Sequence, residues 1–384
     1  MLAYPVPMQT LPPPADDAIA HSAHLREIIQ EQLIAAGGSL PFWKFMELAL
    51  YAPGLGYYSA GATKFGRGGD FVTAPEVSPL FAACVADALT PVLRQLGPEA
   101  QFMEIGGGSG AFAETALAKL LANDALPARY AILEPSADLR ERQRERLQSR
   151  LPPLLFELVE WLDGPIQDAW NGVLFANEVI DALPTPRFSI RDGEVFEEHV
   201  ALDGEGRFLR TDRPADPMLA AAVRHVERQL PEPFAEGYRS EVLAQLPYWL
   251  QAVAGGMGDG AMLFVDYGHG RGEYYQPQRR DGTLRAFRQR QVVLQAVAEQ
   301  EAGLRAVAGE FETRTHAGFG QRGEVHRGGD VLQAGMREHI GHHVVLAERA
   351  QGAVAALRLV VLAAAVTVVD EQHRAIAHTA RHRL

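Results

Sequence analysis

A glycine-rich turn between an apolar segment and a helical pattern is the feature that most constrains the fold. The turn, Gly106-Gly107-Gly108-Ser109-Gly110, directly follows the apolar segment 101–105, and helical periodicity continues over 111–121. Glycine lets a ligand approach the backbone closely, and the first turn of the next helix offers unpaired N–H groups. A strand, a glycine turn and a helix in this order predict an α/β fold with a ligand site at the turn.

The same alternation continues along the chain. Short apolar segments at 130–133, 172–176 and 261–265 are predicted strands, and helices are predicted between them, including one over 137–150. Such an alternation is typical of a parallel sheet that helices cover on both faces. The segment 185–260 is polar and rich in turns, and it predicts an insertion at the edge of this sheet.

Helical spacing of apolar residues also predicts a helix from about His24, a second one after Pro41, and a third over 79–96 that is capped by Ser78. A glycine-rich loop is expected between the second and third helices. The chain is therefore divided into a flexible leader (1–20), N-terminal helices with a glycine-rich loop (21–96), an α/β core with its insertion (97–290) and an atypical tail (291–384).

The glycine turn fits two cofactor classes. Gly106, Gly108 and Ala111 match the dinucleotide pattern G-x-G-x-x-G/A. Glu104, two residues before G-x-G-x-G, is equally typical of class I proteins that bind S-adenosylmethionine (SAM). Glu134 ends the next predicted strand, where a carboxylate can accept both ribose hydroxyls of either cofactor.

The segment Asn177–Pro184 separates these two interpretations. It follows a predicted apolar strand, so Asn177 and Glu178 should lie at the carboxyl edge of the sheet, where α/β proteins bind ligands. Carboxylates there can orient a cationic amine or guanidinium and stabilise charge during methyl transfer, whereas hydride transfer has no evident use for them. Asn177, Glu178 and Asp181 are thus candidate catalytic residues, although Glu178 and Asp181 could instead cap the following helix.

Several motifs occur in one order and carry a resemblance: Gly69–Ser78, the glycine turn, Leu133–Ser136, Asn177–Pro184, Asp266–Gly268 and Gly282–Arg285. The series resembles the MidA-like family of SAM-dependent methyltransferases over roughly residues 20–290. That family includes the mitochondrial complex I assembly factor that dimethylates an arginine of a complex I subunit.

The resemblance implies a class I (Rossmann-like) SAM-dependent methyltransferase sheet with an N-terminal helical extension and an inserted substrate region. It implies three groups of site residues. The residues implied to bind SAM are Glu104, Gly106, Gly108, Gly110 and Glu134. A loop implied to close over the site carries Thr73, Pro75 and Glu76, and the residues implied to face the substrate nitrogen are Glu178, Asp181 and Asn177. Asp163 and Gly164 are expected near the adenine. No metal is implied, because SAM supplies the electrophile.

The activity implied is methyl transfer to a protein arginine, with a complex I subunit as the expected partner. Two alternatives remain, a SAM-binding assembly chaperone without catalysis and an NAD-dependent oxidoreductase. The net charge of −12 does not predict a nucleic-acid-binding surface, and no apolar run reaches the roughly 18–20 residues of a membrane span.

The expected compartment follows from the single cysteine, Cys84, and from an N-terminus that resembles neither a secretory signal nor a transit peptide. Both features indicate a reducing environment. We expect the bacterial cytoplasm, or the mitochondrial matrix if the protein is eukaryotic.

The composition changes near residue 290. All 24 prolines precede it, while eight of the 13 histidines follow it. Three interpretations compete: a helical domain that includes 291–310, a metal-binding tail using His339, His342 and His343, and a GC-rich gene translated in a shifted frame. Family members continue with a Gly-x-x-Asp-Ile-Thr block and the last two strands of the sheet, and no such sequence follows Arg290, which favours the shifted frame and predicts an exposed sheet edge.

Overall fold

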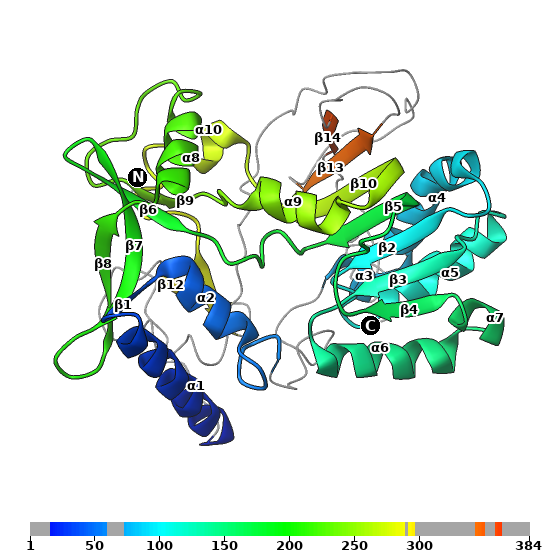
Figure 1. The fold of residues 1–384 in the computed structure, drawn as a ribbon, viewed down its shortest axis with the longest axis horizontal. Helices are drawn as coiled ribbons and strands as arrows, with labels where there is room; N and C mark the ends of the chain where they lie inside the picture. Colours follow the sequence, from blue (N-terminus) through cyan, green and yellow to red (C-terminus); the bar gives the residue numbers. More distant parts are fainter. Residues whose placement is uncertain (1–15, 60–72, 289–290, 296–341, 350–357, 363–384) are drawn as a thin grey trace, which may run out of the picture.

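The computed structural model describes residues 16–59, 73–288, 291–295, 342–349 and 358–362. These residues form two lobes that lie side by side (Figure 1). We call the one built on a seven-stranded sheet the core lobe. The one built on a five-stranded sheet we call the substrate lobe, after the inserted substrate region that the resemblance implies.

The sheet of the core lobe has the order β14-β13-β10-β5-β2-β3-β4, and its strands β10, β5, β2, β3 and β4 are parallel to one another. Its strands are β2 (Gln101–Ile105), β3 (Arg129–Leu133), β4 (Val159–Leu162), β5 (Trp170–Asn177), β10 (Met257–Tyr267), β13 (His342–Arg349) and β14 (Arg358–Leu362). Its helices are α3 (Ala74–Val77), α4 (Pro79–Leu96), α5 (Ala111–Ala122), α6 (Ala137–Arg150), α7 (Pro153–Phe156) and α9 (Leu246–Ala254).

Both faces of this sheet are buried, because neighbouring residues of each central strand belong to different hydrophobic clusters. Phe102 and Phe175 pack with residues of α4 and α5, whereas Met103 and Leu174 pack with residues of α9. The predicted parallel sheet with helices on both faces is therefore confirmed. Strands β2, β3, β5 and β10 were located to within a few residues, whereas β4 was not predicted.

Two predicted helix caps are also confirmed. The Ser78 hydroxyl accepts a hydrogen bond from the Leu80 N–H at 3.2 Å, and the Ser136 hydroxyl accepts one from the Leu139 N–H at 3.3 Å. Each bond satisfies a backbone donor that has no partner within its own helix. The caps fix where the chain enters α4 and α6, the helices next to the expected loop and to Glu134.

The substrate lobe combines the inserted region with the N-terminal segment. Its strands are β1 (Ser39–Pro41), β6 (Arg187–Arg191), β7 (Glu194–Leu202), β8 (Phe208–Pro214) and β9 (Arg239–Glu241). Its helices are α1 (Asp16–Ala35), α2 (Phe42–Tyr51), α8 (Pro217–Glu227) and α10 (Arg271–Tyr274), and a two-stranded sheet joins β11 (Arg285–Arg288) to β12 (Gln291–Gln295).

The insertion does not extend the edge of the main sheet, so that expectation was wrong. Instead β7 pairs with β1 of the N-terminal segment, and Val200 of β7 packs in one cluster with Leu25 of α1 and Phe45 of α2. The two regions bury their apolar faces against each other, which makes a separate sheet possible. Helix α1 begins at Asp16, inside the range expected to be a flexible leader.

The tail supplies strands that the sequence was expected to lack. Strand β13 lies antiparallel to β10, and β14 lies antiparallel to β13. The segment 291–295 is strand β12, which does not fit the interpretation of 291–310 as helical, one of the three that competed for the tail. All three strands are rich in valine, whose branched side chain favours strands. His339 and most of the tail lie outside the described residues.

A buried ion cluster ties the sheet of the substrate lobe to the segment before β11. Arg187, only 1 % exposed, donates to Glu198 at 3.0 Å, to Glu241, and to Asp281 at 3.1 Å. Burial alone would lower the pKa of Arg187, but these carboxylates raise it by more. Glu241 in turn accepts a hydrogen bond from the Thr283 N–H at 3.0 Å.

Replacing Arg187 by methionine should destabilise the protein strongly, because the buried charge of Glu241 would lose its ion pair with Arg187 and the buried charge of Glu198 would keep only its pairs with Arg239 and Arg210. We expect a loss of about 3–5 kcal/mol in the free energy of unfolding, measured by urea denaturation. The control is Arg207→Met, because Arg207 is half exposed in its pair with Asp203 and its loss should cost less than about 1 kcal/mol. Equal losses for the two variants would contradict this account.

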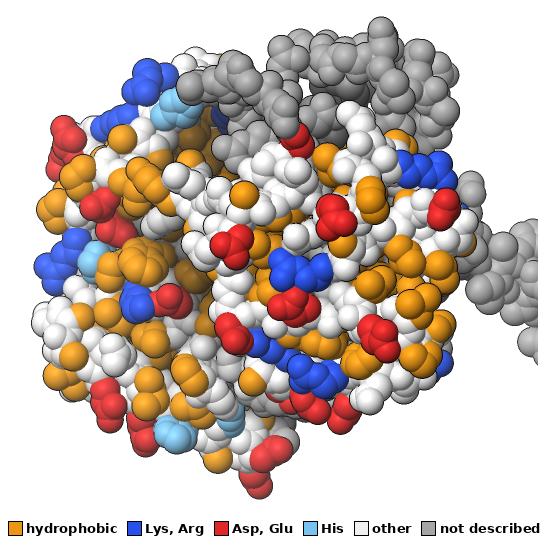
Figure 2. Space-filling view, turned by 45° about the vertical axis from the view of Figure 1, so that its right-hand side comes forward, with side chains coloured by type: hydrophobic (Ala, Val, Ile, Leu, Met, Phe, Trp, Pro, Cys, Tyr) orange, Lys and Arg blue, Asp and Glu red, His pale blue; other side chains and the backbone are white. Residues whose placement is uncertain are grey.

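The surface carries charges of both signs. On the face shown in Figure 2, acidic, basic and hydrophobic side chains are interspersed. Among the helices that the structure describes, none is long and apolar enough to cross a membrane.

Candidate functional site

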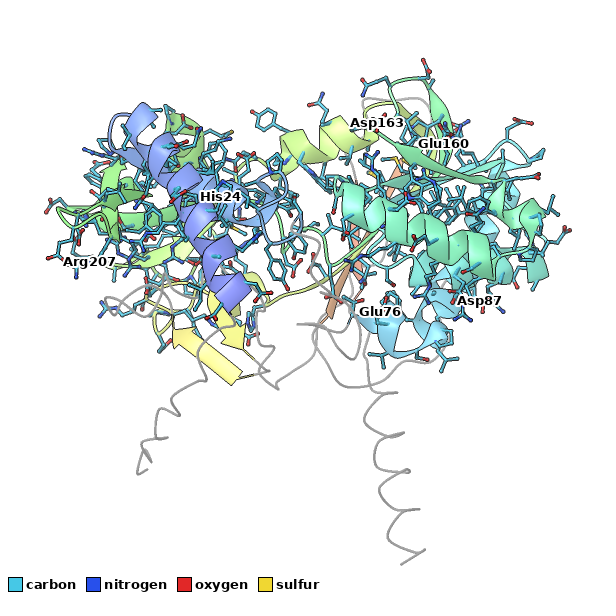
Figure 3. All side chains as sticks on the ribbon, turned by 90° about the horizontal axis from the view of Figure 1, so that it is seen from below. His24, Glu76, Asp87, Glu160, Asp163 and Arg207 are labelled. Carbon is cyan, nitrogen blue, oxygen red and sulfur yellow. The ribbon has the colours of Figure 1, made fainter. Side chains whose placement is uncertain are left out.

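A cavity of about 470 Å³ lies at the carboxyl ends of β2, β3 and β5. This volume is in the range of pockets that bind small molecules and cofactors. Figure 3 shows Glu76 and Asp163, two of its lining residues, on the side of the core lobe that faces the substrate lobe. The predicted site residues that line the cavity are Thr73, Pro75, Glu76, Glu104, Gly106, Gly108, Glu134, Asn177, Glu178 and Asp181. Asp163 and Gly164 line it as well.

The glycine turn follows β2 and lies against the segment after β5. Gly106 has a φ of 70°, and a Cβ there would lie 2.8 Å from the Cγ2 of Val179. Only glycine fits this backbone conformation and this close approach. Gly110 caps α5 with a φ of 81° and is absent from the cavity lining. The conformation of the turn, and not contact with a ligand in the cavity, thus explains why glycine is needed at position 110.

Glu134 directly follows β3 and is held by two donors. Its Oε1 accepts a hydrogen bond from the Ser136 N–H at 3.0 Å, and its Oε2 accepts one from the Gln143 side-chain amide at 3.3 Å. The same amide donates to the carbonyl of Gly108 at 2.9 Å, so Gln143 links Glu134 to the glycine turn. Burial raises the pKa of Glu134 to about 6, against the opposing effect of these hydrogen bonds.

Glu104 lies in β2 and is 3 % exposed. Its Oε2 accepts a hydrogen bond from the Tyr130 hydroxyl at 2.7 Å. Burial raises the pKa of Glu104 to about 7, the Tyr130 hydrogen bond opposes the shift, and the charge of Glu134 adds to it. The two carboxyls therefore gain their charges at higher pH than ordinary glutamates do.

The residues 177–183 form a turn that we call the acid turn. Glu178 adopts a φ of 52°, in the left-handed region, and its N–H donates to the carbonyl of Val265 at 2.8 Å. The Oδ2 of Asp266 accepts two further hydrogen bonds, from the N–H groups of Ile180 at 2.9 Å and Asp181 at 3.1 Å. Strand β10 thus holds the backbone of the acid turn, through the carbonyl of Val265 and the side-chain carboxylate of Asp266. The Asn177 side-chain amide lies 3.5 Å from the Oε1 of Glu178.

The N-terminal segment completes the cavity wall with two tyrosines. The hydroxyl of Tyr51, at the end of α2, donates to the carbonyl of Ala182 in the acid turn at 2.8 Å. Tyr58 stacks on Tyr51 with ring centroids 5.4 Å apart, and both residues line the cavity. On the opposite side, the Ser109 hydroxyl donates to the Glu76 carboxylate, which joins α3 to the glycine turn.

The cavity is strongly acidic. Among the lining residues that the structure describes, Arg140 alone is basic, and it is bound to Asp163 and to the carbonyl of Leu162. The lining carboxyl groups belong to Glu76, Glu104, Glu134, Asp163, Glu178 and Asp181. Such a lining favours a ligand that brings positive charge and N–H donors. Within the described residues, no group of three His, Cys, Asp or Glu side chains could hold a metal ion.

Sequence reasoning missed four residues of this site: Tyr51, Tyr58, Gln143 and Asp266. Asp266 did belong to a motif of the resemblance, Asp266–Gly268. Its side chain accepts hydrogen bonds from backbone N–H groups of the acid turn, however, and this role depends on how β10 lies beside β5. Gln143 and the tyrosines carried no signal of their own. Their contacts join segments far apart in the sequence.

Known proteins resemble this chain in sequence and in structure. A family model described as S-adenosyl-L-methionine-dependent methyltransferase matches residues 84–303. The mitochondrial protein arginine methyltransferase NDUFAF7 homolog of Drosophila melanogaster is 28 % identical over 78 % of this chain and 71 % of its own. Its counterpart in Danio rerio is 26 % identical over 62 % of this chain and 60 % of its own.

Solved structures agree. A Burkholderia thailandensis protein bound to S-adenosyl-homocysteine aligns with a TM-score of 0.67 and 38 % identity, covering 74 % of this chain and 72 % of its own. A native crystal structure from the same organism aligns with a TM-score of 0.65 and 35 % identity, covering 75 % of this chain and 73 % of its own.

Replacing Asp266 by alanine should release the acid turn, because the Ile180 and Asp181 N–H groups would lose their acceptor. We expect their amide hydrogens to exchange about tenfold faster or more, measured by hydrogen exchange, since losing the partner of a buried donor costs roughly 1–3 kcal/mol. Asp266→Asn keeps an acceptor oxygen and should change exchange much less. Unchanged exchange in the alanine variant would show that Asp266 does not hold the turn.

Proposed function

The chain belongs to the family of S-adenosylmethionine-dependent methyltransferases, and we propose that it methylates an arginine side chain of a protein. The observation that carries the proposal is the contact between the glycine turn and the acid turn, where Gly106 lies against Val179 beside Glu178. A methyl donor held at the first turn and a cationic acceptor held at the second would be neighbours.

We assign the cofactor to the residues around the glycine turn. Gly106 and Gly108 would let the methionine part approach the backbone, and Glu104 lies within the same lining. The remaining acceptor sites of Glu134 would take the ribose hydroxyls, and Asp163 with Gly164 would lie near the adenine. When bound, SAM supplies a methyl group on a positively charged sulfur.

We assign the acceptor nitrogen to the acid turn. Glu178 and Asp181 would hold the guanidinium, a planar cation with five N–H donors, and Asn177 would support Glu178. The nitrogen would form a bond to the methyl carbon while the bond between that carbon and sulfur breaks, and the sulfur would keep the electron pair, so that S-adenosylhomocysteine is the leaving group. The nitrogen would also release one proton, so the methylated guanidinium keeps a single positive charge. The Glu178 carboxylate would accept that proton on its way to solvent.

The partner and compartment belong to the same proposal. The names of the Drosophila and zebrafish relatives describe mitochondrial arginine methyltransferases, which supports a protein substrate, and we propose a complex I subunit as that substrate. The mitochondrial relatives support the matrix, whereas the Burkholderia structures support a bacterial cytoplasm. A chaperone that binds SAM without catalysis is the alternative, and it would need Glu134 but not Glu178.

Two substitutions separate binding from transfer. Glu134→Ala should weaken SAM binding by about tenfold or more, since each lost hydrogen bond to a charged acceptor is worth roughly 1.5–3 kcal/mol. Glu178→Gln should leave SAM affinity within about twofold but lower methylation of arginine-containing peptides by about 100-fold or more. Calorimetric titration and transfer of labelled methyl groups measure the two effects. Full transfer by Glu178→Gln would refute the assignment of Glu178, and SAM binding by wild type without transfer to any arginine substrate would favour the chaperone.

The affinity for SAM should decrease as the pH is lowered. Because burial raises the pKa values of Glu104 to about 7 and of Glu134 to about 6, both carboxyls take up protons as the pH drops from 8 to 5. The protonated forms lose acceptor capacity and the negative charge that attracts the cofactor's sulfonium, so the Kd for SAM should rise about tenfold or more over this range. Glu134→Gln should flatten the lower part of the profile. A constant Kd in the wild type would show that neither carboxylate binds in its charged form.

A further inference from the structure

The tyrosines of the N-terminal segment lie at the wall of the cavity, next to the acid turn. Residues 52–59 fold back on the end of α2, where the N–H groups of Tyr57 and Tyr58 donate to the carbonyls of Ala49 and Leu50 at 2.9 and 2.8 Å. A Cβ at Gly56 would lie 2.5 Å from the backbone nitrogen of Ala52, so this return requires glycine. The backbone therefore fixes where the tyrosine rings lie.

Tyr51 and Tyr58 form an aromatic wall that reaches the acid turn. Their rings are stacked at 22°, and the hydroxyl of Tyr51 is bound to Ala182 in that turn. Burial, with added effects from Tyr51 and the charge of Asp181, holds the pKa of Tyr58 well above its ordinary value. Tyr58 is therefore a neutral, desolvated neighbour of the acid turn.

Tyr57 makes an informative contrast. Its ring meets that of Tyr58 edge-on, with centroids 5.1 Å apart, and it packs on the same hydrophobic cluster of the substrate lobe. Unlike Tyr51 and Tyr58, it is absent from the residues that line the cavity. Packing alone thus places a tyrosine in this cluster without bringing it to the site.

An aromatic wall beside two carboxylates does not treat all cations alike. A guanidinium is planar, delocalised and weakly hydrated, so it loses little when aromatic groups replace water around it. A primary ammonium is a compact, strongly hydrated charge, and it loses more in the same surroundings. Attraction between a cation and an aromatic ring is also strongest in desolvated sites.

We propose that Tyr58, stacked on Tyr51, is a specificity-determining residue that makes the acid turn select a guanidinium over a primary ammonium. This inference rests on the proposed transfer to arginine. It assigns the exclusion of lysine to the N-terminal segment, outside the sheet that carries the cofactor residues. The carboxylates supply attraction for any cation, and the aromatic wall supplies the choice between cations.

The test uses two bisubstrate analogues, adenosine joined by one identical linker either to a guanidinium or to a primary ammonium. The adenosine part anchors both compounds, so the ratio of their Kd values reports recognition of the cation without turnover. We expect the full-length wild-type chain to bind the guanidinium compound at least tenfold more tightly. Tyr58→Gln should narrow this ratio to threefold or less while SAM affinity stays within twofold.

Further variants keep the outcome interpretable. Tyr58→Leu is the substitute if the glutamine variant unfolds, and it should narrow the ratio likewise because it removes the aromatic ring. Tyr58→Phe retains the ring and should keep the preference, as should the control Tyr57→Phe. A wild type without preference, or an unchanged ratio in Tyr58→Gln or Tyr58→Leu, would overturn the inference, as would loss of the ratio in Tyr58→Phe. Failure of the proposed function would look different, with the preference present but no methyl transfer to arginine peptides.

Discussion

The hydrogen bonds from two backbone N–H groups to the carboxylate of Asp266 are the interaction on which the site depends. Glu178 sits in a left-handed conformation that non-glycine residues rarely adopt, and such a conformation persists only where neighbouring contacts enforce it. Asp266 enforces it from β10, and the carbonyl of Val265 does so one residue earlier. The glycine turn can then pack closely against Val179. The cavity exists because these two turns meet.

The two lobes contribute different kinds of chemical groups to the lining of this cavity. The core lobe presents backbone groups and buried carboxyls whose pKa values are raised by burial, as at Glu104. The substrate lobe presents aromatic side chains, and its hydroxyl contact from Tyr51 to Ala182 bridges the two. The carboxyl groups and the glycine backbone of the cavity therefore come from one part of the chain, while the two tyrosines of its wall come from another.

Much of the core could be predicted from the sequence, because the signals there are local. The strand before Gly106, the helix after it and the cap at Ser136 each depend on neighbouring residues, and all lie where they were expected. The grouping of Glu134 with Glu178 followed from the rule that ligands bind at the carboxyl edge of a parallel sheet.

The rest of the fold depends on pairing between segments that are distant in the sequence. The spacing of apolar residues along one segment does not indicate which other segment it pairs with. The pairing of β1 with β7 turned an expected edge insertion into a separate sheet. The tail strand β13 pairs with β10, and β14 pairs with β13, despite a composition unlike that of the rest of the chain. Tyr51 and Asp266 were missed for the same reason. Their role lies in the partner atom, and that atom belongs to another part of the sequence.

The hydrogen bond between Tyr51 and Ala182 spans 131 residues of chain. Loops of that length close late, since the entropy of closure must be overcome before the contact contributes any stability. A chain still emerging from the ribosome, or one cut between the lobes, can form the glycine turn well before it can form the complete cavity. A partly folded chain would thus lack the tyrosine side of the cavity even where its glycine turn had already formed.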